Sequence, residues 1–201
     1  MTEQRFADTT AAKLATFSAL LVRWNARVNL VSASTLPILQ RRHIDDSAQL
    51  AAYMPADARS WADLGSGGGF PGLIVAIILQ DQGSPCRVIL VESDQRKAAF
   101  LREAARVLAT EAEVVCARIE AIPPLGADVV SARALAPLPV LLGYAVRHLA
   151  PSGTGLFLKG AGLQAELDSA RRDWTFDAEM LQSQTDAEGT ILRIQGLRRA
   201  D

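Results

Sequence analysis

Hydrophobic positions in the first quarter of the chain follow a helical period. The apolar residues recur at three- and four-residue steps, the spacing of one face of an amphipathic helix: Phe6, Leu14, Phe17, Leu20, Leu21 and Trp24. A polar linker, Asn25 to Ser34, follows. A second helix is expected to begin with Thr35 as its cap, to carry Pro37 in its first turn and to run through Leu50, ending before Pro55.

From Ser60 onward the pattern changes to short apolar runs that alternate with helical periods. This alternation is typical of a parallel sheet whose strands are joined by crossover helices. The predicted strands are Ser60 to Leu64, Arg87 to Glu92, Glu113 to Ala117, Asp128 to Ser131 and Thr154 to Lys159. The predicted helices between them are Pro71 to Leu79, Asp94 to Ala109 and Pro139 to Leu149.

The residue pattern in the last part of the chain predicts a polar helix followed by a β-hairpin. The helix lies around Leu163 to Arg172, and two strands, Trp174 to Leu181 and Thr190 to Leu197, are joined by a loop that contains Asp186 to Gly189. This hairpin would close an α/β sheet with antiparallel strands. Because 201 residues fit one ordinary domain, we expect a helical extension over residues 1–55 and one compact sheet domain over residues 56–201.

Composition places the chain among globular proteins. Apolar residues make up 49% and charged residues 21%, which excludes wholesale disorder and collagen-like structure. The formal charge of -1 argues against a protein that holds nucleic acid by bulk charge alone. Eighteen of the 21 basic residues are Arg, which suits phosphate binding, although an Ala-rich, Arg-rich composition also follows from genomic base composition.

Cysteines and apolar runs bear on compartment and metal binding. Cys86 and Cys116 are too few for a disulfide scaffold and lack the spacing of a metal clip. The N-terminal residues do not have the basic start and apolar run of a secretory signal, and no stretch approaches the roughly eighteen apolar residues of a membrane span. We therefore expect a cytoplasmic protein without a metal site or membrane association.

The most informative segment is a glycine-rich loop, WADLGSGGGFPG, from Trp61 to Gly72. Gly65, Gly67 and Gly69 tolerate positive φ and leave no Cβ in the way of a ligand. Pro71 stands where the first turn of a helix accepts proline. The loop is expected to form a bare shelf at the carboxyl edge of a parallel strand, where ligands of open α/β sheets bind.

Two cofactors fit the spacing of this loop. Residues 67–72 satisfy the G-x-G-x-x-G fingerprint of dinucleotide-binding proteins, and Glu92 lies twenty residues after Gly72. Residues 63–69 satisfy the acidic-x-G-x-G-x-G loop of S-adenosylmethionine enzymes. The motif alone does not decide between a nicotinamide-dependent oxidoreductase and a methyltransferase.

Two features favour the second cofactor. The carboxylate of Asp63 can organise the loop and face an amino group, whereas it would repel a pyrophosphate. The Phe70-Pro71 pair leaves the dinucleotide match out of register with the strand end. Glu92 can accept hydrogen bonds from two ribose hydroxyls of either cofactor and does not discriminate between them. An RNA-binding module with an inactive pocket remains a further, non-enzymatic alternative.

Motifs along most of the chain resemble those of one family, the bacterial small-subunit rRNA guanine-N7 methyltransferases, also called the glucose-inhibited division protein B family. The matching segments are Trp24-Asn25-x-x-x-Asn29-Leu30, His43-x-x-Asp46-Ser47, the loop from Asp63 to Gly72, Ser131-Ala-Arg133-Ala and Leu158-Lys159-Gly160. The resemblance implies a Rossmann-like class I S-adenosylmethionine methyltransferase sheet and a guanine of 16S rRNA near the decoding region as substrate.

The resemblance also implies which residues bind the cofactor. Gly65 and Phe70 would contact it, Ile119 and Glu120 would flank its adenine, and Arg133 would complete the pocket and face the substrate. The complete set expected at the cofactor is Asp63, Gly65, Gly67, Gly69, Phe70, Glu92, Ile119, Glu120 and Arg133.

The substrate side is expected to contain His43, Asp46, Arg133 and Lys159. Guanine N7 is a lone-pair nucleophile without a proton, so methyl transfer requires positioning rather than a general base, and Arg133 would supply that positioning. From the residues alone, His43 suits packing within its helix about as well as substrate contact, and Asp46 suits an ion pair with Arg42 better than a contact with a guanine amino group. His148 is expected to be only a macrodipole partner at a helix end.

The expected partner is 16S rRNA or the small ribosomal subunit, bound by a monomer. Four arginines gather in the N-terminal extension, Arg23, Arg27, Arg41 and Arg42, whereas acids dominate the segment from Asp177 to Glu188. A basic patch of this kind can steer RNA although the net charge is near neutral.

Overall fold

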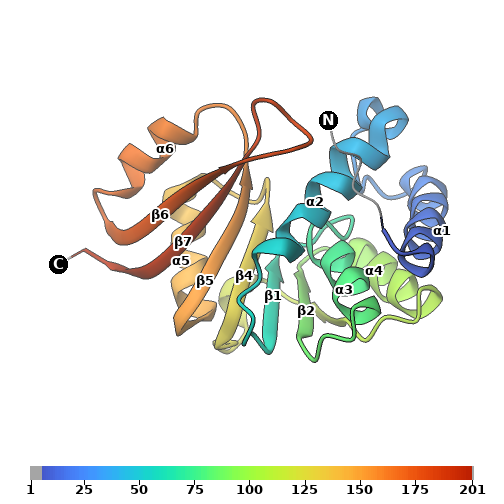
Figure 1. The fold of residues 1–201 in the computed structure, drawn as a ribbon, viewed down its shortest axis with the longest axis horizontal. Helices are drawn as coiled ribbons and strands as arrows, with labels where there is room; N and C mark the ends of the chain where they lie inside the picture. The colour runs from blue at the N-terminus through green and yellow to red at the C-terminus, as the bar shows by residue number, and fades with distance from the viewer. Residues whose placement is uncertain (1–5, 201) are drawn as a thin grey trace.

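A computed structural model describes residues 6–200, and across them the chain forms one seven-stranded sheet of order β3-β2-β1-β4-β5-β7-β6 (Figure 1). The strands are β1 Ser60–Leu64, β2 Arg87–Glu92, β3 Glu113–Cys116, β4 Ala127–Arg133, β5 Leu149–Lys159, β6 Trp174–Gln182 and β7 Thr190–Arg199. The first five strands in the chain pair in parallel, and β7 pairs antiparallel with both β5 and β6. The predicted parallel sheet and its closing antiparallel hairpin are confirmed.

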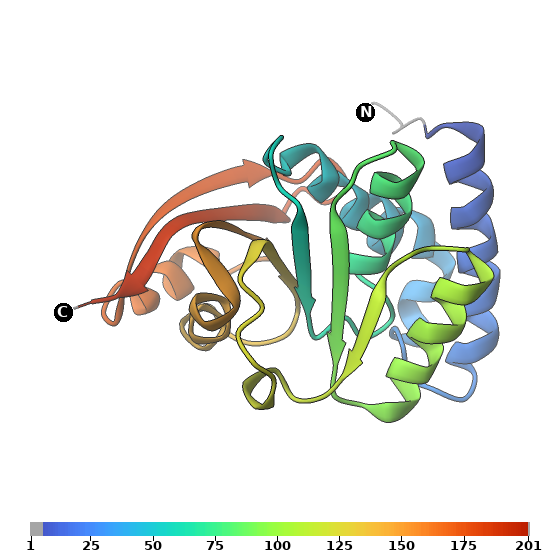
Figure 2. The same ribbon diagram turned by 90° about the horizontal axis from the view of Figure 1, so that it is seen from below.

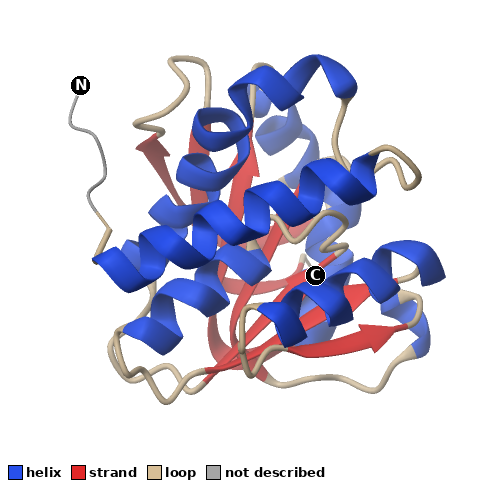
Figure 3. Ribbon diagram, turned by 90° about the vertical axis from the view of Figure 1, so that its right-hand side faces the viewer, coloured by secondary structure: helices blue, strands red, loops and turns tan. Residues whose placement is uncertain are grey.

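Helices cover both faces of the sheet (Figures 2 and 3). On one face lie α1 Asp8–Asn25, α3 Gly72–Asp81 and α4 Gln95–Val107, and on the other lie α5 Leu138–His148 and α6 Leu163–Ala170. Residues 72–79 of α3 are apolar on every side of the helix and all buried, as suits a helix packed between the sheet and α1. None of the helices within residues 6–200 is both long and apolar enough to cross a membrane.

The segment expected to form one helix from Thr35 to Leu50 is instead a series of short helical pieces. A 3-10 helix, η1 Ala33–Ile38, leads into a π-helical turn, η2 Gln40–Asp45, then into α2 Asp46–Ala48 and a 3-10 helix, η3 Gln49–Tyr53. Thr35 lies within η1 and donates to Ser32 O (2.8 Å) rather than capping a helix. The expectation of a single α-helix is wrong, because π turns accommodate an extra residue that the 3.6-residue pattern does not reveal.

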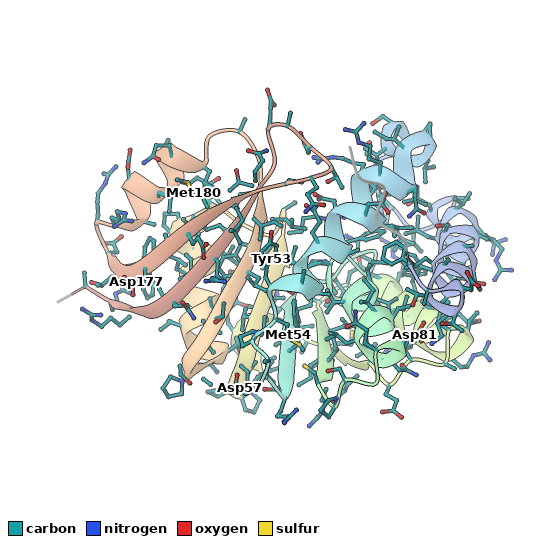
Figure 4. The ribbon with its side chains drawn as sticks, in the orientation of Figure 1. Tyr53, Met54, Asp57, Asp81, Asp177 and Met180 are labelled. Carbon is teal, nitrogen blue, oxygen red and sulfur yellow. The ribbon has the colours of Figure 1, made fainter. Side chains whose placement is uncertain are left out.

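The predicted polar linker between the first two helical parts is a tight, hydrogen-bonded bend. Asn25 belongs to α1, and its Oδ1 accepts hydrogen bonds from the backbone N–H groups of Leu30 (2.9 Å) and Val31 (3.0 Å). At the other end of α1, Asp81 of α3 accepts from Thr10 Oγ1 (2.8 Å) and pairs with Lys13. Figure 4 labels Asp81, at the end of α3. These contacts fix α1 at both ends.

The N-terminal helical part and the sheet share one hydrophobic core. Phe17 of α1 is fully buried and contacts Phe70 edge-on, with ring centroids 5.5 Å apart, and Phe100 of α4 at 6.2 Å. Leu14, Leu20 and Leu21 belong to the same cluster as the apolar residues of α3. The extension therefore forms part of the wall behind the glycine loop.

Candidate functional site

The glycine loop begins where β1 ends and is held against the neighbouring strand. The backbone N–H groups of Gly65 and Ser66 both donate to Val91 O, at 2.9 and 3.0 Å. Gly65 has φ +70° and Gly67 has φ +53°, a region that side chains disfavour. The loop therefore turns tightly at the carboxyl edge of the sheet, as the sequence predicts.

Asp63 lies beneath this loop. Its side chain is fully buried, its Oδ2 accepts from Gly72 N–H (3.1 Å) and its Oδ1 accepts from Ser131 Oγ (2.7 Å). Ser131 Oγ in turn accepts from Trp61 Nε1 (2.8 Å). Burial raises the pKa of Asp63 to about 6, although these hydrogen bonds oppose the rise. Asp63 thus ties both ends of the loop together, and it is not among the described residues that line the two cavities at this edge of the sheet.

A cavity of about 320 Å³ lies in front of the loop. Its walls come from the carboxyl ends of β1, β2, β3 and β4, and the predicted cofactor residues among them are Gly65, Gly67, Glu92, Ile119, Glu120 and Arg133. Glu92 is buried, and its two carboxylate oxygens accept from Gly67 N–H and Asp94 N–H, each at 2.8 Å. Two fixed hydrogen bonds orient the carboxylate and leave lone pairs free for further donors.

The far wall of this cavity is a short turn, η4 Ile119–Ala121. Glu120 Oε1 accepts from Tyr144 Oη (2.9 Å), which also lines the cavity. His148 is fully buried in the last turn of α5, and its Nε2 donates to Ile119 O (3.0 Å). Burial lowers the pKa of His148, and the hydrogen bond to Ile119 holds this turn, a contact that the expectation of a macrodipole partner alone does not include.

A second cavity, of about 510 Å³, adjoins the first and is lined by η2, α2, the end of β5 and the β6–β7 loop. The two cavities share the segment Arg133 to Ala136. Asp46 and Lys159, both expected at the substrate, line the larger one. Lys159 pairs with Glu166 at 2.5 Å, and Asp46 is 5% exposed.

Arg133 is the charged side chain common to both cavities. Its guanidinium carbon lies 4.7 Å from the centroid of the Phe70 ring, and Nη1 donates to Arg42 O (3.4 Å) and lies 3.9 Å from Asp46 Oδ2. Burial lowers the pKa of Arg133 to about 10, so the group is still a cation at neutral pH. A cation fixed at this junction can act on groups in either cavity.

His43 lies behind this junction. Its ring stacks on Phe70 at 5.1 Å, and Nε2 shares a hydrogen bond of 2.8 Å with Thr35 Oγ1. Burial, together with the charges of Arg133 and Arg42, lowers the pKa of His43 to about 4, so the ring is neutral at pH 7. It does not line either cavity.

The predicted site residues thus form two layers. One layer lines the cavities: Asp46, Gly65, Gly67, Glu92, Ile119, Glu120, Arg133 and Lys159. A second layer supports it from behind and consists of His43, Asp63, Gly69 and Phe70. The residue Phe70 is 3% exposed to solvent. Sequence reasoning missed Tyr144 and the loop from Ser183 to Gly189, because no motif links them to the site. Among residues 6–200 no group of three or more His, Cys, Asp or Glu side chains is arranged to hold a metal ion.

Known proteins are similar to this chain along most of its length. The family described as rRNA small subunit methyltransferase G matches residues 10–193. The protein named "Ribosomal RNA small subunit methyltransferase G" from Parvibaculum lavamentivorans is 53% identical over 195 residues, covering 96% of this chain and 85% of the relative. The protein of the same name from Paracoccus denitrificans is 51% identical, covering 94% of this chain and 96% of the relative.

Solved structures of low sequence identity share the fold. A TehB-like SAM-dependent methyltransferase from Corynebacterium glutamicum has a TM-score of 0.59 at 17% identity and covers 90% of this chain and 98% of its own. M. jannaschii TYW2 in complex with AdoMet has a TM-score of 0.59 at 12% identity, covering 79% of this chain and 77% of its own. The predicted Rossmann-like class I methyltransferase fold is confirmed.

Proposed function

Because this chain belongs to the rRNA small subunit methyltransferase G family, we propose that it transfers a methyl group from S-adenosylmethionine to N7 of a guanine in 16S rRNA, near the decoding region. The observation that carries this function is the pair of adjoining cavities that meet at Arg133, one in front of the glycine-rich loop and one beside it. The family and the structural neighbours favour this cofactor over the nicotinamide alternative.

The residues around the smaller cavity suit S-adenosylmethionine. A Cβ on Gly67 would meet only Gly65 O, at 3.8 Å, so the loop presents bare backbone to the cavity. The oriented carboxylate of Glu92 has lone pairs left for two ribose hydroxyls, and Ile119 supplies an apolar wall for the adenine. Asp63, Gly69 and Phe70 act on the cofactor indirectly, through the shape of the loop.

When bound, the cofactor would supply a sulfonium methyl carbon for transfer to N7, with the bonding pair of the broken carbon–sulfur bond left on sulfur and the positive charge passed to the purine. No proton moves, so this chain needs no general base. Its contribution is to hold the acceptor in line with the methyl group, which can lower the barrier by about 7–11 kcal/mol. Arg133, fixed over Phe70 at the junction of the cavities, is the positioning group.

The larger cavity takes the target nucleotide. Arg133 and Lys159 provide cationic groups for a phosphate or a base edge, and Asp46 provides an acceptor. His43 holds the ring of Phe70, and through it Arg133, from the side opposite the cavities. The partner is 16S rRNA within the small ribosomal subunit, and the protein acts as a cytoplasmic monomer.

The test uses small ribosomal subunits from cells that lack this protein. Incubation with the protein and methyl-labelled S-adenosylmethionine should label 16S rRNA, and borohydride–aniline cleavage should then cut the rRNA at one guanine. Equilibrium binding should detect S-adenosylmethionine or its demethylated product and not NAD. Binding of NAD instead, or the absence of label in the rRNA, would overturn the proposed function.

A further inference from the structure

The larger cavity contains a buried carboxylate whose two oxygens differ in their surroundings. Asp46 is the first residue of α2, directly after the π-helical turn, and its side chain faces the cavity although it is 5% exposed. A buried carboxylate is costly unless its oxygens accept hydrogen bonds. The two oxygens of Asp46 meet this requirement unequally.

One oxygen is held by the β6–β7 loop. Oδ1 accepts from Thr185 Oγ1 (2.8 Å), from Ser183 Oγ (3.3 Å) and from Gln49 Nε2 (3.4 Å). The loop is itself tied down, because Gln184 N–H donates to Gln49 Oε1 (2.7 Å) and Arg42 pairs with Asp186 at 2.8 Å. A segment about 140 residues away in the chain thus fixes the carboxylate in one rotamer.

The other oxygen, Oδ2, differs from Oδ1 in having no hydrogen-bond donor among the described residues. Within residues 6–200, Asp46 Oδ2 accepts no hydrogen bond, and the cation beside it, Arg133 Nη1, is 3.9 Å away and donates to Arg42 O instead. An oriented carboxylate with one free oxygen at the wall of a cavity is an acceptor site for N–H groups of a ligand.

We propose that Asp46 is the residue that selects guanine, accepting through Oδ2 from the N1–H and 2-amino edge of the target base, and that Thr185 and Ser183 are its positioning residues. The inference rests on the proposed function. Among the bases of RNA, guanine alone presents these two adjacent donors. They lie on the side of the purine opposite N7, so a carboxylate there holds the base without occupying the methyl acceptor.

The same contact favours the reaction itself. Methylation at N7 gives the purine a positive charge, which makes N1–H a stronger donor and strengthens its attraction to a carboxylate. An interaction that is stronger in the transition state than in the ground state raises kcat, not only affinity. A carboxylate that merely neutralised Arg133 or held the loop would have no reason to distinguish one purine from another.

The experiment compares small subunits reconstituted with 16S rRNA that carries guanine or inosine at the methylated position. Inosine has the same ring as guanine, with N1–H and N7, but it lacks the 2-amino group. The wild-type protein should show a kcat/KM for guanine at least about tenfold above that for inosine, since inosine cannot make the hydrogen bond that the 2-amino group donates to the charged carboxylate. D46N should lower kcat for guanine at least about tenfold and bring the two substrates within about twofold, with unchanged affinity for the demethylated cofactor product.

Thr185 provides a matched test of positioning that keeps the carboxylate. T185V removes the hydroxyl without changing the shape of the side chain, and it should lower kcat for guanine severalfold while the KM for the cofactor stays the same. T185S restores the hydroxyl and should restore kcat. Q184A is the control in the same loop, because the Gln184 side chain is exposed and the loop contact uses its backbone N–H, so it should behave like wild type.

Three outcomes would overturn the inference: equal rates of the wild-type protein on both particles, a guanine preference that persists in D46N, or full activity of T185V. Failure of T185S to restore kcat would equally contradict a role for the hydroxyl. A wild-type protein that binds S-adenosylmethionine but methylates neither particle would instead overturn the proposed function, and the inference with it. If D46N fails to fold, the T185V and T185S pair still decides the positioning role.

Discussion

Arg133 carries its positive charge in a largely buried position, where a charge is energetically unfavourable. Its side chain is 17% exposed, and burial lowers its pKa to about 10. Contact with the face of the Phe70 ring and the proximity of Asp46 offset part of this cost. A cation kept at the boundary between two cavities at such a cost indicates a role in ligand binding rather than in stability alone.

Replacing Arg133 with Ala should therefore impair methyl transfer more than folding. We expect kcat/KM for small subunits to fall by about a hundredfold or more, the size of effect seen when a fixed electrostatic group is removed from an active site. Thermal unfolding should stay cooperative. R193A, which breaks an exposed pair with Glu179, is the control and should leave methylation unchanged. Unchanged turnover of R133A would remove Arg133 from the site.

Asp63 gives the protein a characteristic dependence of stability on pH. Burial raises its pKa in the folded protein from 3.8 to about 6. At pH values between 3.8 and about 6, the folded state therefore keeps a proton on Asp63 that the unfolded state has released. The resulting stabilisation is complete below about pH 4, falls as the pH rises toward about 6, and is absent above it. The shift corresponds to about 3 kcal/mol.

The variant D63N isolates this contribution because Asn does not titrate. The free energy of unfolding of the wild type minus that of D63N should decrease by about 2–3 kcal/mol between about pH 4.5 and pH 7 and then level off. Urea unfolding of both proteins at each pH measures the difference, in which other titrating groups cancel. A difference that stays flat, or that increases with pH, would contradict a raised pKa for Asp63.

At the scale of elements, Gly72 joins the glycine loop to α3 at a point without free space. A Cβ on Gly72 would lie 2.4 Å from Asp63 Cβ, 2.5 Å from Leu90 Cδ2 and 2.6 Å from Asp63 Oδ2. The absence of a side chain lets the start of α3 rest directly on β1 and β2. Its backbone N–H reaches Asp63 for the same reason.

G72A should destabilise the protein by about 1–3 kcal/mol or more, since a methyl group there must displace a packed strand side chain or the buried carboxylate. G143A is the matched control in α5, where the new Cβ would meet only Trp174 Cζ2, at 3.7 Å. That change should be neutral or stabilise the helix by up to about 1 kcal/mol. Denaturant unfolding compares the two, and equal stability of G72A and G143A would disprove the close approach.

Elements with strong local signals were predictable from the sequence. The strands Ser60–Leu64 and Arg87–Glu92 have the predicted ends, because apolar runs bounded by turn residues define them locally. β5 begins earlier than predicted, at Leu149, because an irregularity in its pairing with β4 adds residues that carry no apolar pattern. The π-helical turn before Asp46 could not be predicted, since packing against the rest of the molecule sets it.

The candidate site was predictable to the extent that its residues follow strand ends. Gly65, Glu92 and Arg133 each end or follow a parallel strand, so the topology brings them to one edge of the sheet. Whether a residue faces the cavity or supports it from behind is a question of side-chain direction, which is why Asp63 and Phe70 were expected at the cofactor. The contact of Thr185 with Asp46 joins two loops far apart in the chain and has no local signal.

At the scale of the whole molecule, opposite charges meet across the larger cavity. The arginines of the extension and the acids of the C-terminal segment, separate in the sequence, are neighbours in the fold: Arg42 pairs with Asp186, and Arg41 Nε donates to Thr185 O (2.9 Å). The basic patch expected from the sequence is therefore partly neutralised beside the cavity, whereas Arg23 and Arg27 are exposed on and after α1.

The N-terminal extension shares its core with the sheet, so we expect it to be required for the fold as well as for the cavity wall. Phe17 is fully buried between Phe70 and Phe100, so F17A should cost about 3–5 kcal/mol in unfolding free energy. Because Phe70 also supports Arg133, the variant should lose methylation under conditions in which it is still folded. V22A, at a position of α1 that is 49% exposed, should change stability by less than about 0.5 kcal/mol.

A chain that starts at Ala56 extends the same argument to the entire extension. It lacks all of α1 through η3, so the apolar faces of α3 and α4 that pack against Phe17 and Leu21 would be exposed to water. We expect this fragment to show no cooperative unfolding transition in urea and to bind no cofactor, because the glycine loop loses the wall behind Phe70. Cooperative unfolding with the stability of the whole chain would mean that residues 56–201 fold independently, and the extension would then serve the substrate alone.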